Sequence, residues 1–278
     1  MAELKNTTIN DTGAAQLPVG NTAQRPVSPN DGYMWFNTDE NKVEYYTNGL
    51  WIKMPDIVRK NLAVYLDANN VASYPGTGNT WFDLSGRGRN YSIGPNISWN
   101  SSGYFSCNGG TFTGPASNTF GFSSYNEHTI EVFAKTDIAT SNNFFYWEAT
   151  PNTGTDTRAI QTHLFYGNGN TYYDVSGCCT ATQRIQYPND FDLTSGIKHL
   201  VWRTRKNAFP NRQFFKNTLE QMNSGSNNTA TVNWNLSTPA TIGNSWVGDI
   251  YLFRVYNRAL SDEEIQQNFN SNRIRFGI

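Results

Sequence analysis

The C-terminal part of the chain alternates between two sets of side chains and then changes to a helical pattern. Residues 247–256 (VGDIYLFRVY) predict a strand, because successive side chains of a strand point to opposite faces. One predicted face carries Ile250, Leu252 and Arg254, and the other carries Tyr251, Phe253 and Val255. Both faces are largely apolar, so we expect this strand inside a sandwich and not at a sheet edge.

A short closing helix is predicted directly after this strand. Ser261 is a typical N-cap residue, and Glu264, three positions later, completes a capping box. Asp262 and Glu263 place negative charge on the first turn, where the helix dipole favours it. We therefore expect a last core strand that a helix after Leu260 locks in place.

Apolar runs of strand length recur through residues 61–278, and turn-forming Gly, Pro and Asn separate them. The pattern predicts strands at 62–67, 104–107, 128–134, 143–148, 159–166, 198–204, 212–216, 240–242 and 247–256. Only the segment after Leu260 has a helical pattern. This spacing is typical of an all-β fold, and we predict a two-sheet antiparallel jelly-roll sandwich.

Residues 1–60 have a different composition and predict a separate small module. Residues 17–32 (LPVGNTAQRPVSPNDG) are rich in proline and should run extended. Three short strands follow at 33–37, 42–46 and 50–53, with a tight turn at Asn48-Gly49. Such a β-meander has little core of its own, so we expect it to need a partner surface or copies of itself.

Two segments of the large domain resemble a known family. GDIYLFRVYNRALSDEEI (248–265) resembles the C-terminal signature of the concanavalin A-like (LamG-type) lectin and glucanase sandwich, which is found in many bacteriophage structural proteins. YLDA (65–68) and WFDLSG (81–86) are similar to the opening strand and turn of the same family. The resemblance implies a concanavalin A-like sandwich over 61–278 and a phage virion protein of the tail fibre, neck or capsid decoration type.

The N-terminal module resembles a segment that recurs near the N-termini of phage tail-fibre and other virion proteins. The similarity covers most of residues 7–53, including PVGNTAQRP and VEYYTNGLW. It implies attachment to other virion proteins, a homotrimer, and location in the virion after synthesis in the host cytoplasm. The candidate attachment residues are Leu17, Pro18, Arg25, Trp35 and Trp51.

Composition excludes several other classes of function. The net charge is −1 and only 15% of residues are charged, whereas a nucleic-acid binder needs a basic surface. No apolar run is long enough to insert into a membrane. The three cysteines, Cys107, Cys178 and Cys179, give neither a disulfide framework nor zinc spacing. We expect free thiols; a strained bridge between Cys178 and Cys179 is the alternative.

A glycosidase of the glucanase type needs two carboxylates on one strand face, about 5 Å apart in retaining enzymes. The nearest pattern is Glu127 and Glu131, which lacks the intervening acid. We interpret the pair as structural, with Glu131 facing solvent. His128, His163 and His199 have no catalytic partner at a recognisable spacing. We therefore predict that the protein is not an enzyme.

Asp83, in the turn after Trp81, has two open interpretations. It can fix the turn through its side chain, which we favour. It can also bind calcium, as in some LamG-type domains, with Asp67 and Asp249 as the other candidate ligands. We predict that the protein binds no cofactor. If Asp83 is instead a metal ligand, the bound ion would be calcium.

A glycan site needs exposed rings beside amide and carboxylate groups. Residues 143–147 and 167–174 (GNGNTYYD) have this composition, as does 244–246. The candidates are Tyr172 and Tyr173, expected on a loop, with Asp174 and Trp147. The leading hypothesis is a virion structural protein that projects a lectin-like domain, with host-surface glycan binding as a further role. The alternatives are a receptor-recognition lectin proper and a glycan depolymerase.

Overall fold

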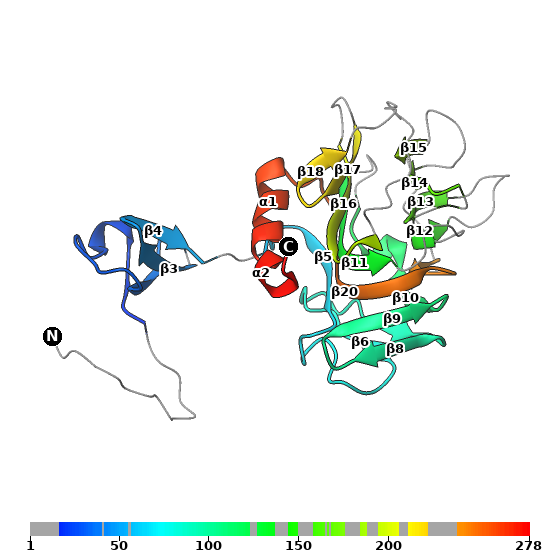
Figure 1. Cartoon of the computed structure of the whole chain (residues 1–278), viewed down its shortest axis with the longest axis horizontal. Helices are drawn as coiled ribbons and strands as arrows, with labels where there is room; N and C mark the ends of the chain where they lie inside the picture. The colour runs from blue at the N-terminus through cyan, green and yellow to red at the C-terminus, as the bar shows by residue number, and fades with distance from the viewer. Residues whose placement is uncertain are drawn as a thin grey trace. The chain divides into compact units, whose positions relative to one another are not determined.

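In this computed structural model the chain divides into two compact units, Met1–Asp56 and Ile57–Ile278, and each is described by itself (Figure 1). Ile57 and Val58 pack with buried side chains of the larger unit, so that unit begins before the boundary at residue 60 that the sequence predicted. The structure describes residues 17–40, 42–54, 57–122, 127–136, 144–149, 158–164, 166, 168–175, 184–187, 194–205, 211–221 and 238–278.

The small unit contains one four-stranded sheet. Its strands pair in the order β1 (Val19–Gly20), β2 (Met34–Asn37), β3 (Lys42–Thr47) and β4 (Leu50–Lys53). The predicted meander is β2–β3–β4, and Asn48 and Gly49 turn it with positive φ angles of 50° and 80°. The sequence did not predict β1, which pairs in parallel with β2, or the 3-10 turn Thr22–Gln24.

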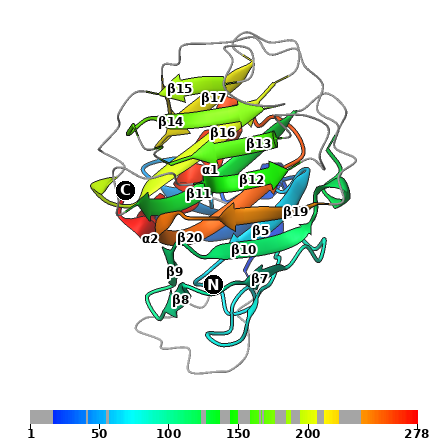
Figure 2. The ribbon, with the colours of Figure 1, turned by 90° about the vertical axis from the view of Figure 1, so that its right-hand side faces the viewer.

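The described strands of the large unit form two antiparallel eight-stranded sheets. Figure 2 looks onto sheet I, which follows the order β15 (Arg184–Tyr187), β14 (Thr171–Val175), β13 (Arg158–His163), β12 (Phe144–Ala149), β19 (Pro239–Gly243), β10 (Thr111–Ala116), β7 (Tyr91–Ile93) and β6 (Thr80–Trp81). Sheet II follows the order β18 (Leu219–Gln221), β17 (Arg212–Lys216), β16 (Lys198–Thr204), β11 (His128–Thr136), β20 (Val247–Tyr256), β9 (Tyr104–Asn108) and β8 (Ile97–Asn100), with β5 (Leu62–Asp67) paired to β20. The fold is therefore all-β, as predicted.

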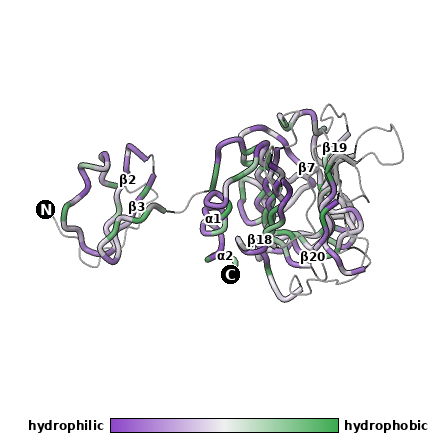
Figure 3. The backbone as a smooth tube through the Cα atoms, turned by 90° about the horizontal axis from the view of Figure 1, so that it is seen from above, coloured by the Kyte–Doolittle hydropathy of each residue, from purple (hydrophilic) through white to green (hydrophobic). Residues whose placement is uncertain are grey.

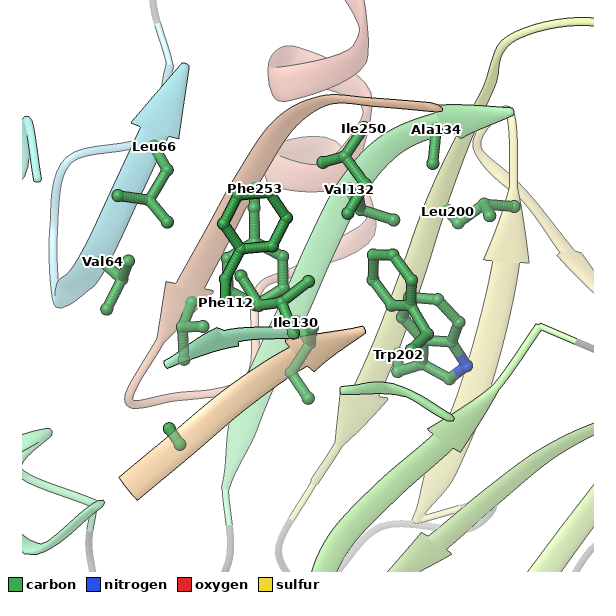
Figure 4. Packing of buried hydrophobic residues seen from close by; sticks show 14 of the residues in the cluster. Val64, Leu66, Phe112, Ile130, Val132, Ala134, Leu200, Trp202, Ile250 and Phe253 are labelled. Atoms are coloured by element: carbon green, nitrogen blue, oxygen red, sulfur yellow. The ribbon is translucent and has the colours of Figure 1, made fainter. Parts of the chain in front are cut away.

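The main core lies between the two sheets, whose inner side chains are aliphatic and aromatic (Figure 4). Phe145 of sheet I stacks on Trp202 of sheet II, with ring centroids 5.6 Å apart. Trp81 of sheet I meets Phe105 of sheet II edge-on at 4.8 Å. Trp246, which lies in one of the candidate glycan stretches, is fully buried in this core.

Strand β20 lies inside sheet II, as its two apolar faces predicted. However, the alternation breaks at a bulge, where Phe133 pairs with Leu252 and Ala134 pairs with Ile250. Tyr251 is the extra residue. Ile250 therefore faces the main core with Phe253, and not the outer face with Arg254 as the simple alternation predicted.

The predicted closing helix is confirmed as α1 (Asp262–Asn270). Ser261 is its N-cap, and the side chains of Ser261 and Glu264 each accept from the other's backbone N–H. A single turn, α2 (Arg273–Phe276), follows and was not predicted. The helices lie on the outer side of sheet II (Figure 1), where Ile265 packs in a second cluster with Val201 and Phe215. Among the described residues no helix has the length and apolar character needed to cross a bilayer.

Candidate functional site

The outer face of sheet I carries an aromatic and polar group of side chains on β13, β14 and β15. Tyr173 of β14 belongs to the main core, so its neighbours Tyr172 and Asp174 point to the outside of the sheet. Pairing places Gln161 opposite Asp174 and His163 opposite Tyr172. On the other side Arg184 and Gln186 pair with the same two residues. We call Gln161, His163, Tyr172, Asp174, Arg184 and Gln186 the β13–β15 face.

A buried ion pair lies at the centre of this face. Arg184 donates from Nε to Oδ1 and from Nη2 to Oδ2 of Asp174, both at 2.7 Å. The Asp174 carboxylate is fully buried, whereas the Arg184 side chain stays 19% exposed. Burial alone would lower the pKa of Arg184, but the bonds to Asp174 raise it above its usual value. A fixed, charged guanidinium therefore reaches the surface here.

The Arg184 guanidinium also covers the ring of Tyr172, 4.1 Å from its centroid. The Tyr172 hydroxyl accepts from Nδ2 of Asn168 at 2.6 Å and from Nδ2 of Asn170 at 3.3 Å. Tyr166 meets Tyr172 edge-on at 5.6 Å and is 37% exposed. An accessible ring, amide groups and a guanidinium are thus close together.

These groups have the chemistry that binds a sugar. The Tyr166 ring can stack on the C–H face of a pyranose, and Arg184 can donate to hydroxyl or carboxylate oxygens. Oε1 of Gln161 is buried and has no hydrogen-bond partner among the described residues, so the face also holds an unused acceptor. Because Gln161, His163, Tyr172 and Asp174 are buried, a ligand would meet this face at Tyr166, Gln186 and the exposed part of Arg184.

Two of the four predicted glycan residues have side chains on the outer side of sheet I. Tyr172 and Asp174 are on the β13–β15 face. Trp147 of β12 pairs with Gln161, which places its backbone in the same row, and its side chain lies outside the described residues. Tyr172 and Tyr173 were wrong as exposed loop residues, because both lie in β14. Tyr172 is only 5% exposed, and Tyr173 is fully buried. Its hydroxyl contacts Nε2 of His128 and lies 2.7 Å from Oγ1 of Thr204.

Sequence reasoning missed Arg184, Tyr166 and Gln161 as members of this site. Arg184 and Gln186 lie in a four-residue strand that was not predicted. Gln161 lies in a predicted strand, but its position opposite Asp174 follows only from the strand register, which the sequence does not give.

The aspartates considered for calcium are occupied by donors of the protein itself. Oδ1 of Asp83 accepts from the backbone of Tyr65 and Ser85, and Oδ2 accepts from Oγ of Ser85 and the backbone of Arg89. These bonds support the turn-fixing interpretation. Asp67 forms a two-bond ion pair with Arg275, at 2.7 and 2.8 Å. Within the described residues no cluster of three or more His, Cys, Asp or Glu side chains could hold a metal ion.

The carboxylates considered for glycosidase chemistry are not a pair on one accessible face. Glu131 is fully buried beneath α1, so the expectation that it faces solvent was wrong. It accepts from Nη1 of Arg254 at 3.1 Å and from Nδ2 of Asn268 at 3.0 Å, and it lies 2.6 Å from Nε2 of His199. These contacts support the structural interpretation of Glu131. Glu127 lies before β11 and is partly exposed.

Burial alone would raise the pKa of Glu131, but the charge of Arg254 and the hydrogen bond with His199 outweigh burial and lower it. The group is therefore an anion that holds α1 onto sheet II. Of the cysteines, Cys107 is free and buried; Cys178 and Cys179 lie outside the described residues.

The predicted attachment residues all lie in the small unit but have different environments. Leu17 and Pro18 precede β1, and Pro18 is exposed. Trp35 is buried, and Arg25 forms a two-bond ion pair with Glu44. Trp51 packs edge-on against Tyr46 at 5.4 Å. Trp35 and Arg25 therefore build the unit's interior.

Comparison with known proteins identifies the fold. No protein-family model matches the sequence, and no curated protein is similar to it in sequence. A solved structure of Trypanosoma rangeli sialidase in complex with sialic acid is similar at a TM-score of 0.58 and 13% identity, over 88% of this chain and 45% of that chain. The binding domain of Botulinum neurotoxin DC in complex with rat synaptotagmin II is similar at 0.56 and 14%, over 77% and 52%. This chain spans about half the length of these proteins.

These similarities correct the prediction that the protein is not an enzyme. The solved structures with this fold include sialidases, which are enzymes, and one of them is a covalent intermediate with 2,3-difluorosialic acid. At 13–14% identity the similarity establishes the fold and assigns no reaction. Sialidases and a toxin binding domain thus share the all-β architecture of this chain.

Proposed function

We propose that this protein is a structural protein of a bacteriophage virion, a fibre, neck or capsid decoration subunit, whose sandwich attaches to a glycan on the host surface. The small N-terminal unit joins it to other virion proteins, as its resemblance to virion modules implies. The two sheets are connected as a concanavalin A-like jelly roll; their antiparallel pairing and face-to-face packing support this connectivity.

The observation that carries the attachment function is the β13–β15 face with its neighbour Tyr166. It combines a partly exposed ring, the Arg184 guanidinium fixed by Asp174, and amide groups around Tyr172. Two of the proteins with this fold were solved in complex with sialic acid and with rat synaptotagmin II, so the fold occurs in proteins that bind a sugar or another protein. Guanidinium groups bind carboxylates well, which favours acidic sugars such as sialic acid among the ligands to test.

A glycan array probed with the full chain, with and without calcium, tests the proposal. Tyr166→Ala should weaken binding about tenfold, because one stacked ring contributes roughly 1.4 kcal/mol. Phe82→Ala is the matched control, since Phe82 is a similarly exposed ring of the same unit at 41%. The control should bind as the natural chain does.

Absence of any glycan binding by the full chain would overturn the attachment function. So would equal binding by the Tyr166→Ala and Phe82→Ala variants, because the site would then lie elsewhere. Release of free sugar from the array would instead identify a glycan depolymerase. For the virion assignment, antibodies against the full chain should label purified phage particles, and unlabelled particles would contradict it.

A further inference from the structure

The two helices cover only part of the outer side of sheet II. Helix α1 packs on β16 and β17, and Phe276 of α2 packs on Phe133 of β11 and Tyr251 of β20. Figure 3 shows both helices on this side of the large unit, away from β7 and β19 of sheet I. Strands β9 and β8 continue the sheet beyond β20, and Ser98 and Asn108 on them are exposed.

The strand alternation sets a row of polar side chains on this uncovered part. Phe105 of β9 and Ile250 of β20 belong to the main core, so their neighbours Ser106 and Asp249 point outward. Pairing places Ser98 opposite Ser106, and Ser106 opposite Asp249. These three side chains therefore form one row across β8, β9 and β20.

A cleft of about 420 Å³ lies along this row. Its polar lining consists of the row itself together with Asn96 and Asn108. The backbone N–H of Asn108 donates to the carbonyl oxygen of Asn96 at 2.9 Å, which fixes the two residues against each other. Small-molecule sites have volumes of about 300–1,000 Å³, so the cleft is large enough for one. We call it the β8–β9–β20 cleft.

The polar groups of the cleft match a ligand with several hydroxyls. Oγ of Ser106 donates to Oδ1 of Asp249 at 2.7 Å, which holds both side chains in place. A carboxylate has about four acceptor positions, so Asp249 can also accept from hydroxyls of a ligand. The amides of Asn96 and Asn108 can both donate and accept, as sugar hydroxyls do.

The charges around the cleft favour an uncharged ligand. Asp249 is the one charged side chain in its lining, and its carboxylate repels anions. Lys135 of β11 lies next in the same row, opposite Asp249, so a cation would meet a positive side chain beside the carboxylate. The β13–β15 face differs, because there the exposed charge is the Arg184 guanidinium.

Two tyrosines lie beside the polar row on the same face. Tyr104 of β9 is two positions before Ser106, and Tyr251 of β20 is two positions after Asp249. Their rings are 5.1 Å apart between centroids, and both side chains are half-buried. A partly exposed ring beside carboxylate and amide groups is suited to the C–H face of a sugar. We propose that the β8–β9–β20 cleft binds an uncharged sugar unit, which Asp249 holds by its hydroxyls and Tyr104 by its C–H face.

This site goes beyond the proposed attachment to an acidic glycan. The β13–β15 face is on the outer side of sheet I, and the cleft is on the outer side of sheet II, so they hold separate sugar units. A chain with both sites binds more tightly to a surface that displays both kinds of sugar, because the second contact is intramolecular.

Calorimetric titration of the full chain with linear trisaccharides of glucose, galactose, mannose and N-acetylglucosamine tests the cleft. At least one of them should bind. Ser98→Tyr should abolish that binding, because Ser98 is exposed and lines the cleft, which the new ring would fill. Ser92→Tyr is the matched control, since Ser92 is an exposed strand serine of sheet I, and it should bind as the natural chain does.

A second variant covers the case in which Ser98→Tyr disturbs the edge strand. Asp249→Asn keeps the size of the side chain and should weaken binding about tenfold, because hydrogen bonds to a charged acceptor are the stronger ones. Failure of all four trisaccharides to bind would overturn the proposal. So would equal binding by Ser98→Tyr and Ser92→Tyr, or undiminished binding by Asp249→Asn.

The two sites fail separately in these measurements. Tyr166→Ala should leave the titration with neutral trisaccharides unchanged, and Ser98→Tyr should leave binding of acidic glycans on the array unchanged. Loss of neutral binding in Tyr166→Ala would overturn the cleft, because the neutral sugar would then lie on the β13–β15 face.

Discussion

Replacing Glu131 by Gln tests whether the buried anion under α1 holds the sandwich together. Gln has nearly the same volume, so the substitution removes the charge without opening a cavity. Its side-chain oxygen can still accept from Asn268 or from His199. The fully buried Arg254 guanidinium, however, would lose the carboxylate with which it pairs among the described residues.

The expected decrease in the free energy of unfolding follows from the removal of this charge. Breaking a buried ion pair from one side costs about 3–5 kcal/mol, because the other charge stays buried without compensation. Because Glu131→Gln keeps some of the hydrogen bonds, we expect it to lower the free energy of unfolding by about 3 kcal/mol, at the lower end of this range. Domains of this size are stable by about 5–15 kcal/mol, so the change is large. Glu127→Gln is the matched control, since that carboxylate is partly exposed and should change stability by no more than about 0.5 kcal/mol.

Urea unfolding of the full chain, followed by fluorescence of the buried tryptophans, measures the loss. Trp81, Trp202 and Trp246 are all fully buried in the sandwich, so its unfolding changes the signal. Comparison with Glu127→Gln cancels the contribution of Trp35 and Trp51 in the small unit. A loss below about 1 kcal/mol, or one equal to that of Glu127→Gln, would refute the reasoning. It would mean that Arg254 finds another anion or water when Glu131 is neutral.

Acid adds a second test of the same group. The folded-state pKa of Glu131 is lowered, so its contribution is present above the unfolded value of about 4.3. That contribution is lost as the pH falls through the folded value. The natural chain should therefore lose stability more steeply than Glu131→Gln below that pH. Parallel curves for the two proteins would contradict the assignment of a charged Glu131.

Three further predictions, one labelling experiment and two substitutions, concern other parts of the fold. Burial raises the pKa of the Cys107 thiol, so alkylation should not modify it until the sandwich unfolds; mass spectrometry of natively labelled protein checks this. Ser261→Ala should destabilise the large unit by about 1 kcal/mol through loss of the α1 cap, whereas the exposed Ser102→Ala should not. Gly20→Ala should unfold the small unit, because its Cβ would lie 2.5 Å from the Trp35 ring; limited proteolysis checks this, and a small unit as resistant as that of the natural chain would contradict it.

Strand boundaries could be predicted where the apolar alternation is long. β5, β16, β17 and β20 begin and end at the predicted residues. The α1 cap was equally clear, since Ser261 and Glu264 form a local pattern. Four-residue strands were predicted only where a turn signal marked them: β4 follows Asn48-Gly49, whereas β8 and β15 were missed.

The environment of Glu131 could not be predicted, because it depends on contacts that are distant in sequence. Its neighbours on β11 indicate only an alternating strand. Arg254 and Asn268 reach it from 123 and 137 residues later. Whether a charged residue on the outer side of a sheet is buried therefore depends on the helix that covers it.

The candidate site and the core depend on the same pairing register. Tyr172 and Tyr173 are neighbours of the same type, and composition cannot tell which one faces outward. Pairing of Thr162 with Tyr173 fixes the answer, since it places Tyr173 in the core and Tyr172 beside Arg184. A shift by one residue would exchange the two rings, with Tyr172 in the core and Tyr173 beside Arg184. The small sheet obeys the same rule with the opposite result: its register buries Glu44 and leaves Tyr45 outside. In both units, therefore, the alternation along each strand decides which side chains share a face. Only the tertiary structure decides which of the two faces is buried.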